Sequence, residues 1–306
     1  MKPDARQRVT GRWLVFLATV FWGTTATLAR SVFRDHHVPA LAVVELRLTI
    51  AALLLFAWLV IGRRDALRLE RRDIGYFVVL GLAGVAAVQG SYYYSISRLG
   101  VGLAILLQYL APSLLVLWDI VRGRRPAPAL IAAVLLAIVG TALLVVGVDP
   151  RTLQARPLDW AIGLSSAVIF AFYVSYSKRG LRRYAPETVL FYTFSIAAVF
   201  WAIVVPPATI LAAHYPPALW GRFMLLGVFS TLVPFACFYA GLKRLPATEA
   251  GVLATSEPVV AIVAAWLFLG ETLHAQQWLG ATLVIGASVL ASRDHPETAE
   301  ASVERS

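Results

Sequence analysis

The sequence predicts an all-α integral membrane protein in which ten transmembrane helices form two inverted five-helix repeats. Three observations predict this fold: ten apolar stretches fill nearly the whole chain, basic residues alternate between its loops, and the second half repeats the first. Hydrophobic residues make up 59% of the 306 residues and charged residues only 14%, against about 25% charged in soluble domains. This composition favours a lipid bilayer as the solvent.

Each apolar stretch is about twenty residues long, the length of a helix that crosses the hydrocarbon core, and lacks the alternation of a barrel strand. Hydrocarbon offers no water to backbone N–H and C=O groups, so a spanning segment must pair them internally. Segments 132–146 and 259–269 also lack the polar stripe of a soluble helix. The predicted helices are 12–32, 38–61, 74–97, 101–121, 129–148, 158–178, 188–207, 221–242, 247–270 and 274–292.

Turn and charge signals separate these elements in order. The first stretch follows a basic tail, and we interpret it as a retained helix because cleavage as a signal peptide would leave nine spans. Gly100-Val101-Gly102 divides the third stretch from the fourth, and Pro246-Ala247 divides the eighth from the ninth. The predicted domains are a tail at 1–11, a first repeat at 12–148, an outer linker at 149–157, a second repeat at 158–292 and a polar tail at 293–306.

The net charge of +10 is distributed asymmetrically across the predicted spans. If the N-terminus is cytoplasmic, twenty of the 27 Lys and Arg residues lie in the tails and loops on that side, and six lie on the other. This asymmetry follows the positive-inside rule and predicts that both termini are cytoplasmic. The basic runs are therefore interpreted as topology signals that also contact anionic lipid, and no nucleic-acid partner is expected.

The chain repeats itself with a shift of 146 residues. In both halves an aromatic span ends in Arg-Leu, a short turn follows, and the next span carries a central proline. Five spans per half is an odd number, so the second half must insert in the opposite orientation, and inverted repeats place a central site between the halves. The alternative is a duplication kept for packing alone. The matched pairs are Tyr93/Tyr239, Arg98/Arg244, Leu99/Leu245, Ala104/Ala250, Leu107/Leu253, Pro112/Pro258, Ala129/Ala275, Gly140/Gly286 and Leu144/Leu290.

Three features near mid-membrane are candidates for a site. Pro112 and Pro258 remove an intrahelical hydrogen bond in matching spans, which favours a gate or binding pair, although close packing of kinked helices would use them equally. Glu257 precedes Pro258, where a charge costs on the order of 3 kcal/mol. Glu257 is our best candidate for a substrate-amine contact or a proton-coupling group. The alternative is a neutral carboxyl group bonded to the freed backbone.

Arg47 is the one arginine well inside a predicted span. Its planar guanidinium suits a substrate carboxylate, or it pairs with an internal acid and locks its helix. Glu45 is an unlikely partner because residues two apart do not share a helix face.

Polar and aromatic side chains on neighbouring spans could line an amphipathic cavity for a small molecule. Helical spacing places Gln89 and Tyr93 on one face, and Gln108 and Pro112 on another. Ordinary aromatic packing is the alternative. The residues that could complete this cavity are Trp22, Tyr173, Tyr176, Phe235 and Tyr239.

Several chemistries have no sequence support. The chain has no phosphate-binding GxxxxGK motif and no HExxH motif, and its five histidines lie in loops, at span ends or in the tail. No mid-span lysine is available to activate a serine, so an enzyme is not expected, and neither a cofactor nor a metal is predicted. The single cysteine, Cys237, lies in an apolar run and is interpreted as a packing residue.

Five motifs make the chain resemble the drug/metabolite transporter superfamily, specifically ten-helix exporters built from two EamA repeats. They are Trp22-Gly23, Arg47 with Leu48–Leu55, SRLGVGLAILLQYLAP at 97–112, ATEAGVLATSEP at 247–258 and WLFLGET at 266–272. The resemblance covers roughly residues 13–292. The first repeat departs from the pattern, because Gly123-Arg124-Arg125 lacks the acidic residue found in Gly270-Glu271.

The resemblance implies secondary transport around a central cavity in the cytoplasmic membrane. We therefore expect alternating-access export of a small amphiphilic metabolite, such as an amino acid, an amine or a drug-like molecule, with proton coupling as an option. A carrier for a sugar-nucleotide or lipid-linked substrate would need several basic groups in the cavity, and a membrane scaffold or receptor would show no flux. The sequence leaves the substrate, the coupling ion and the oligomeric state open.

Overall fold

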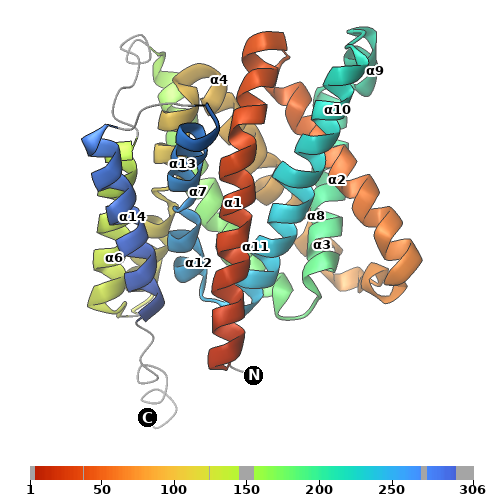
Figure 1. Cartoon of the computed structure of the whole chain (residues 1–306). Coiled ribbons are helices and arrows are strands. Elements are labelled where there is room, and N and C mark those ends of the chain that lie inside the picture. Colours follow the sequence, from red (N-terminus) through yellow and green to blue (C-terminus); the bar gives the residue numbers. More distant parts are fainter. Residues whose placement is uncertain (1–3, 37, 124, 145–154, 270–273, 294–306) are drawn as a thin grey trace.

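The computed structural model describes residues 4–36, 38–123, 125–144, 155–269 and 274–293, which form an all-helical bundle (Figure 1). The predicted outer linker and polar C-terminal tail lie largely outside these residues. The first half contains α1 (Ala5–His36), α2 (Ala40–Gly62), η1 (Arg64–Leu67), η2 (Arg71–Asp73), α3 (Ile74–Val79), η3 (Leu80–Ala86), α4 (Ala87–Gln108), α5 (Ala111–Val121) and α6 (Pro128–Leu144). The second contains α7 (Pro157–Leu181), α8 (Pro186–Val204), α9 (Pro207–Ala212), α10 (Pro217–Leu225), η5 (Leu226–Leu232), α11 (Val233–Arg244), α12 (Ala247–Ala254), α13 (Glu257–Leu269) and α14 (Ala275–Arg293).

Six helices are long and apolar enough to cross a membrane, and two shorter helices are also apolar. With helix α1 and the α12–α13 pair, the described part of the chain has ten membrane-spanning segments. The six long helices are Ala40–Gly62, Arg71–Gly100, Gly102–Val121, Pro157–Leu181, Pro186–Val204 and Pro217–Arg244, and the shorter ones are Pro128–Leu144 and Ala275–Ala291. The chain is therefore an integral membrane protein of the fold class that the sequence predicts.

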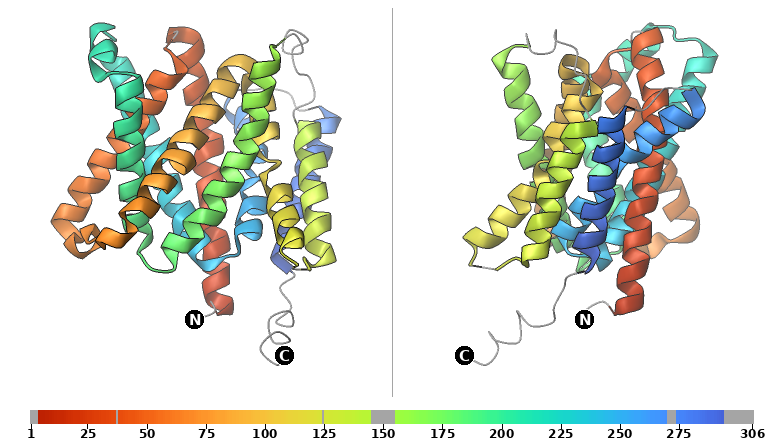
Figure 2. Two further views of the ribbon diagram at one scale, coloured as in Figure 1. Left: turned by 180° about the vertical axis from the view of Figure 1, so that it is seen from behind. Right: turned by 60° about the vertical axis from the view of Figure 1, so that its left-hand side comes forward.

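The two halves are inverted copies of each other. Helices α1 and α7, which open the halves, run in opposite directions through the bundle (Figure 2). The start of α1 and the end of α14 lie at the same end of the bundle (Figure 1). We call this the basic end, because Arg63, Arg122, Arg183 and Arg244 lie in or beside the turns there.

The repeat of 146 residues extends to irregularities that were not predicted. Each half contains a π-helical segment inside a long span, at Leu80–Ala86 and at Leu226–Leu232, and these two segments match residue for residue under the shift. Each half also has one span that breaks into two helices, at Tyr109–Leu110 and at Thr255–Ser256. π-Bulges and broken helices are features that often mark functional sites.

The expected turn after the third span lies at Gly100, which adopts a φ of 81° within α4 and separates the spanning helices Arg71–Gly100 and Gly102–Val121. One predicted feature differs in detail. Pro112 and Pro258 do not kink continuous helices. Each lies in the first turn of a new helix, where a missing N–H costs nothing because that group has no intrahelical partner.

Close contacts between glycines and backbone hold the bundle together. Helix α6 packs on α14, where a Cβ atom on Gly280 would lie 2.6 Å from the carbonyl oxygen of Gly140. Helix α1 packs on α11 and α13, and α4 packs on α7. A Cβ on Gly23 of α1 would lie 2.9 Å from the carbonyl oxygen of Glu257. Helix α1 therefore contacts the start of α13 through its backbone.

Candidate functional site

The candidate site lies where the two broken spans meet near the middle of the bundle. In the first break, Tyr109 N donates to Ile105 O at 2.9 Å and Leu110 N to Leu107 O at 3.2 Å, which closes α4 before α5 begins. In the second break, Thr255 N donates to Val252 O and Ser256 N to Leu253 O, both at 3.1 Å. Each break therefore ends one helix at mid-span and exposes the N-terminus of the next.

Glu257 is the first residue of α13, immediately after the second break. The positive end of a helix dipole stabilises a carboxylate at this position. The hydroxyl group of Tyr109, in the first break, donates a hydrogen bond of 2.6 Å to Glu257 Oε2. A single short bond thus joins the two broken spans.

Tyr109 was not among the predicted site residues. Its side chain is buried, and its position matches Thr255 of the second break under the shift of 146. The sequence signal was present, because Tyr109 stands three residues before Pro112, but only the structure shows that its hydroxyl reaches across the repeat.

Arg47 on α2 is buried, with 4% of its surface exposed. Its Nε donates to Thr231 Oγ1 at 2.7 Å and its Nη2 donates to Ser230 O at 2.9 Å, both in the π-helical η5. The guanidinium carbon lies 4.6 Å from the centre of the Tyr93 ring. Among the described residues Nη1 has no hydrogen-bond partner. Arg47 is therefore oriented by the protein and keeps one donor group available.

Arg47 and Glu257 attract each other but form no direct ion pair within the part of the chain that the structure describes. Tyr92 interacts electrostatically with both charges. The site thus combines a cation, an anion and phenol groups in a low-dielectric setting, where polar contacts are strong. Such an arrangement can receive a small molecule that carries both charges.

The predicted aromatic residues fall into two groups. Trp22 contacts Phe235 with ring centroids 5.1 Å apart, and Tyr173 contacts both Phe235 and Tyr239, at 6.5 and 5.9 Å. The Tyr176 ring instead stacks on the Tyr76 ring with centroids 4.8 Å apart, and the Tyr176 carbonyl oxygen accepts a hydrogen bond from the Tyr76 hydroxyl.

Tyr176 therefore belongs with the network at the basic end and is not part of the aromatic cluster around Phe235. Gln89 and Gln108 are both buried. Neither amide takes part in the described hydrogen bonds of Arg47 or Glu257.

The basic end of the bundle is closed by polar contacts. Arg12 Nε pairs with the fully buried Glu249 at 2.8 Å, which ties α1 to α12. Lys178 donates to the carbonyls of Leu242 and Leu245 and so binds α7 to the end of α11. In the turn after α7, burial and a 2.6 Å bond to Asp73 raise the pKa of Tyr184.

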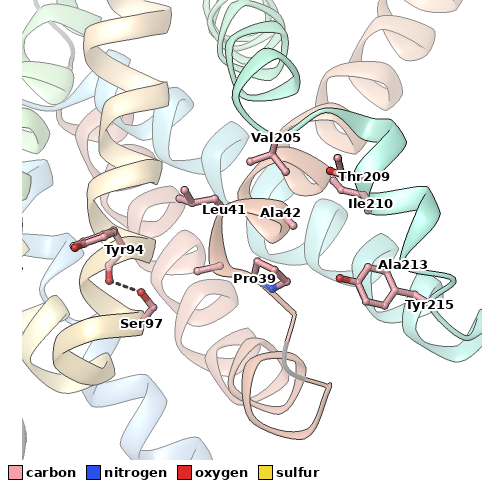
Figure 3. A pocket seen from close by; sticks show the side chains of 11 residues that line it. Pro39, Leu41, Ala42, Tyr94, Ser97, Val205, Thr209, Ile210, Ala213 and Tyr215 are labelled. Atoms are coloured by element: carbon pink, nitrogen blue, oxygen red, sulfur yellow. Dashed lines mark hydrogen bonds between the residues drawn. The ribbon is translucent and has the colours of Figure 1, made fainter.

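The opposite end contains a cavity of about 540 Å³ between the start of α2, α4 and the α8–α9 segment (Figure 3). Leu41 and Ala42 line it from α2, and Tyr94 and Ser97 line it from α4. The Tyr94 hydroxyl also donates to Asp159 at 2.8 Å, which joins α4 to α7. This cavity therefore lies at the end opposite the basic residues.

The fold and the site define a membrane transporter of the kind built from inverted repeats, with discontinuous helices around a central polar site. The chain belongs to the EamA-like transporter family, whose model matches residues 9–146 and 160–293. The family and the similar proteins named below are transporters and not enzymes.

Several curated proteins are similar over nearly the whole chain. An uncharacterized inner membrane transporter, YicL, of Salmonella typhimurium is 25% identical over 94% of this chain and 96% of its own length. The threonine/homoserine exporter RhtA of Salmonella typhimurium is 30% identical over 91% of each chain. The RhtA of Escherichia coli is 29% identical over 90% of this chain and 88% of its own.

A solved crystal structure has the same fold. It superposes with a TM-score of 0.72, covers 92% of this chain and 96% of its own, and shares 24% sequence identity.

Proposed function

We propose that this protein exports a small zwitterionic metabolite of the amino-acid class by alternating access across the cytoplasmic membrane. The observation that carries the proposal is the pairing of Arg47 and Glu257, two opposite charges held near each other at mid-membrane without a direct contact. An ammonium group fits Glu257 and a carboxylate fits the available Nη1 of Arg47.

The energetics favour a ligand with both charges. Charges inside a membrane are costly unless they are paired. A zwitterion between Arg47 and Glu257 satisfies both side chains in one binding event, whereas a simple amine or acid leaves one of them unmatched. The aromatic cluster of Trp22, Phe235 and Tyr173 supplies apolar contact for the remainder of the molecule.

The relatives support this substrate class. Proteins similar to this chain at 29–30% identity are named threonine/homoserine exporters. Threonine and homoserine each carry an ammonium and a carboxylate group, the two groups that this proposal assigns to Glu257 and Arg47.

Alternating access is supported by the unequal ends of the bundle. We assign the basic end to the cytoplasm by the positive-inside rule, which makes both termini cytoplasmic. Contacts such as Arg12–Glu249 close this end, while the 540 Å³ cavity lies at the other. In this proposal, rocking of the two five-helix repeats exposes the site to the two ends of the bundle in turn.

A counterflow assay in proteoliposomes tests the proposal. Vesicles preloaded with threonine, homoserine or another amino acid are expected to accumulate the same amino acid, radiolabelled, from outside. The assay is run at two imposed pH gradients. Vesicles preloaded with decarboxylated amines or carboxamides are expected to show little uptake. Glu257→Gln should abolish this flux with the protein still folded in the membrane, and Glu187→Gln, at an exposed pair with Arg63, serves as the matched control. Wild-type flux in Glu257→Gln would contradict the proposed role.

A further inference from the structure

A second buried carboxyl group lies on α2, away from the site described above. Glu45 has 1% of its surface exposed. Thr49, one turn further along α2, donates its hydroxyl to Glu45 Oε1 at 3.0 Å. Among the described residues the other oxygen, Oε2, has no hydrogen-bond partner. A buried carboxylate with one donor is an incompletely satisfied group.

No cation compensates Glu45 within the described part of the chain. Helix α2 packs against α8, α4, α10, η5 and η1. The titratable and charged groups on these elements interact with residues other than Glu45 or lie at the ends of the bundle. On α8, Glu187 pairs with Arg63 and Tyr192 donates to Leu67 O. On α4, Arg98 and Tyr94 contact Asp159, and Tyr92 and Tyr93 lie near Arg47; Arg222 of α10 has an interaction of its own, and Arg64 and Asp65 lie at the basic end. Among the residues that the structure describes, Thr49 is the one that interacts with the Glu45 carboxyl group.

Glu45 lies directly below the wall of the outer cavity. Leu41 and Ala42 line that cavity, and Glu45 is four and three residues further along the same helix. Residues at these spacings share a helix face, and side chains tilt toward the helix N-terminus, which here is the cavity end. The carboxyl group is therefore one helical turn from a hollow that opens toward the outer end of the bundle.

Helix α2 separates this carboxyl group from the substrate site. Arg47 is two residues after Glu45, so their side chains leave the helix on nearly opposite sides. Arg47 binds Thr231 and Ser230 of η5, while Glu45 follows Leu41 and Ala42, which line the cavity, by one helical turn. One rigid helix thus carries a cation toward the substrate site and an acid toward the outer end.

We propose that Glu45 is a proton-binding site loaded from the outer cavity, and that it couples proton entry to export. A proton on Oε2 removes the buried negative charge of Glu45. A metal ion would need several more oxygen ligands than one carboxyl group and one hydroxyl provide. The step is a simple binding equilibrium in which the carboxylate takes one proton from the outer side and releases it to the basic side after the bundle rocks. This inference rests on the proposed function for its coupling role, although proton binding by Glu45 can be measured separately.

Carbodiimide labelling measures the proton binding without any transport. Dicyclohexylcarbodiimide reacts with protonated carboxyl groups in apolar surroundings, so we expect a Glu45 adduct in the purified full-length protein, located by peptide mass spectrometry. Above its titration midpoint the adduct should fall about tenfold per pH unit. Glu45→Gln removes the adduct and Glu45→Asp restores it, while Glu187→Gln leaves it unchanged. The absence of a Glu45 adduct at every pH overturns the proposal.

Transport with an imposed pH gradient, acidic outside, tests the coupling. The readout is the ratio of flux with the gradient to flux without it. We expect Glu45→Gln to reduce this ratio to unity, with Glu45→Asp and Glu187→Gln keeping it high. Should Glu45→Gln fail to fold, Thr49→Val removes the hydrogen bond from Thr49 to the carboxyl group and should shift the pH dependence of labelling. A wild-type ratio in a folded Glu45→Gln protein overturns the coupling role. Flux that responds to an imposed sodium gradient and not to a pH gradient overturns it as well.

Discussion

In the proposed function, Arg47 and Glu257 are the two residues that recognise the ligand. The protein fixes each of them with its own hydrogen bonds, from Arg47 to Thr231 and Ser230 and from Tyr109 to Glu257. Fixed side chains recognise a ligand better than mobile ones, because less conformational entropy is lost on binding. The proposed site is thus preorganised for a ligand with a positive and a negative group.

The sequence identified both charges as candidates, because each interrupts an apolar span. It could not identify Tyr109 or the partners of Arg47. Tyr109 lies 148 residues from Glu257 in the chain, and Thr231 lies 184 residues from Arg47. Contacts at such separations depend on the fold and leave no local pattern.

The bond from Tyr109 to Glu257 gives the first prediction. Tyr109→Phe removes one hydroxyl group and leaves the ring packed against Phe170. A hydrogen bond to a charged group contributes about 1.5–3 kcal/mol, so we expect the apparent affinity for substrate in counterflow to fall roughly tenfold or more. The thermal stability of the detergent-solubilised protein should change little.

Tyr192→Phe is the matched control, because it removes a hydroxyl bonded to Leu67 O at the basic end. Equal losses of affinity in Tyr109→Phe and Tyr192→Phe would show that the Tyr109 hydroxyl has no specific role.

At the scale of helices, the matching breaks and π-helical segments explain how an apolar bundle creates a polar centre. A continuous helix satisfies its own backbone, whereas a helix that begins at mid-membrane presents free N–H groups to a ligand. The sequence singled out Pro112 and Pro258 as matching kinks, but it did not predict that each span breaks into two helices beside them. It did not predict the π-helical segments, because no residue type in Leu80–Ala86 marks one extra residue per turn.

The contact of α1 with the start of α13 gives a second prediction. A Cβ at Gly23 would lie 2.8 Å from Ala261 N and 2.9 Å from Glu257 O, both backbone atoms. Gly23→Ala must therefore push α1 away from α13, at a cost of about 1–3 kcal/mol, and displace Glu257. We expect a lower melting temperature in detergent together with reduced counterflow.

Gly221→Ala on α10 provides the comparison, because a Cβ there meets no atom within 4 Å. If Gly23→Ala behaves like Gly221→Ala in both assays, the helix packing described for α1 is wrong.

For the whole molecule, the proposed alternating access requires two alternative states of one bundle. The sequence predicted ten spans, their inversion and the basic end from periodicity and charge. It could not predict which end is closed, because closure depends on side chains that meet across the bundle, such as Arg12 with Glu249 and Lys178 with the end of α11.

Closure of the basic end gives a third prediction. Arg12→Gln removes the positive charge that pairs with the fully buried Glu249. A buried carboxylate without this partner is costly, so the variant should favour a state in which the basic end is open and Glu249 contacts water. A cysteine at Thr248, in a Cys237→Ser background, should then react faster with a membrane-impermeant maleimide applied from the cytoplasmic side. Arg63→Gln breaks an exposed ion pair at the same end and should leave the labelling rate unchanged. A rate in Arg12→Gln no higher than in Arg63→Gln would remove the Arg12–Glu249 pair from the closure.

The most direct test of the account pairs changes in the protein with changes in the ligand. Binding affinities are measured for threonine, for its decarboxylated amine and for its deaminated acid, with the wild-type protein, Arg47→Gln and Glu257→Gln. We predict that losing the carboxylate weakens binding to the wild type but not to Arg47→Gln, and that losing the ammonium weakens binding to the wild type but not to Glu257→Gln. Equal penalties in the wild type and in both variants would contradict the claim that Arg47 and Glu257 hold the two ends of one substrate.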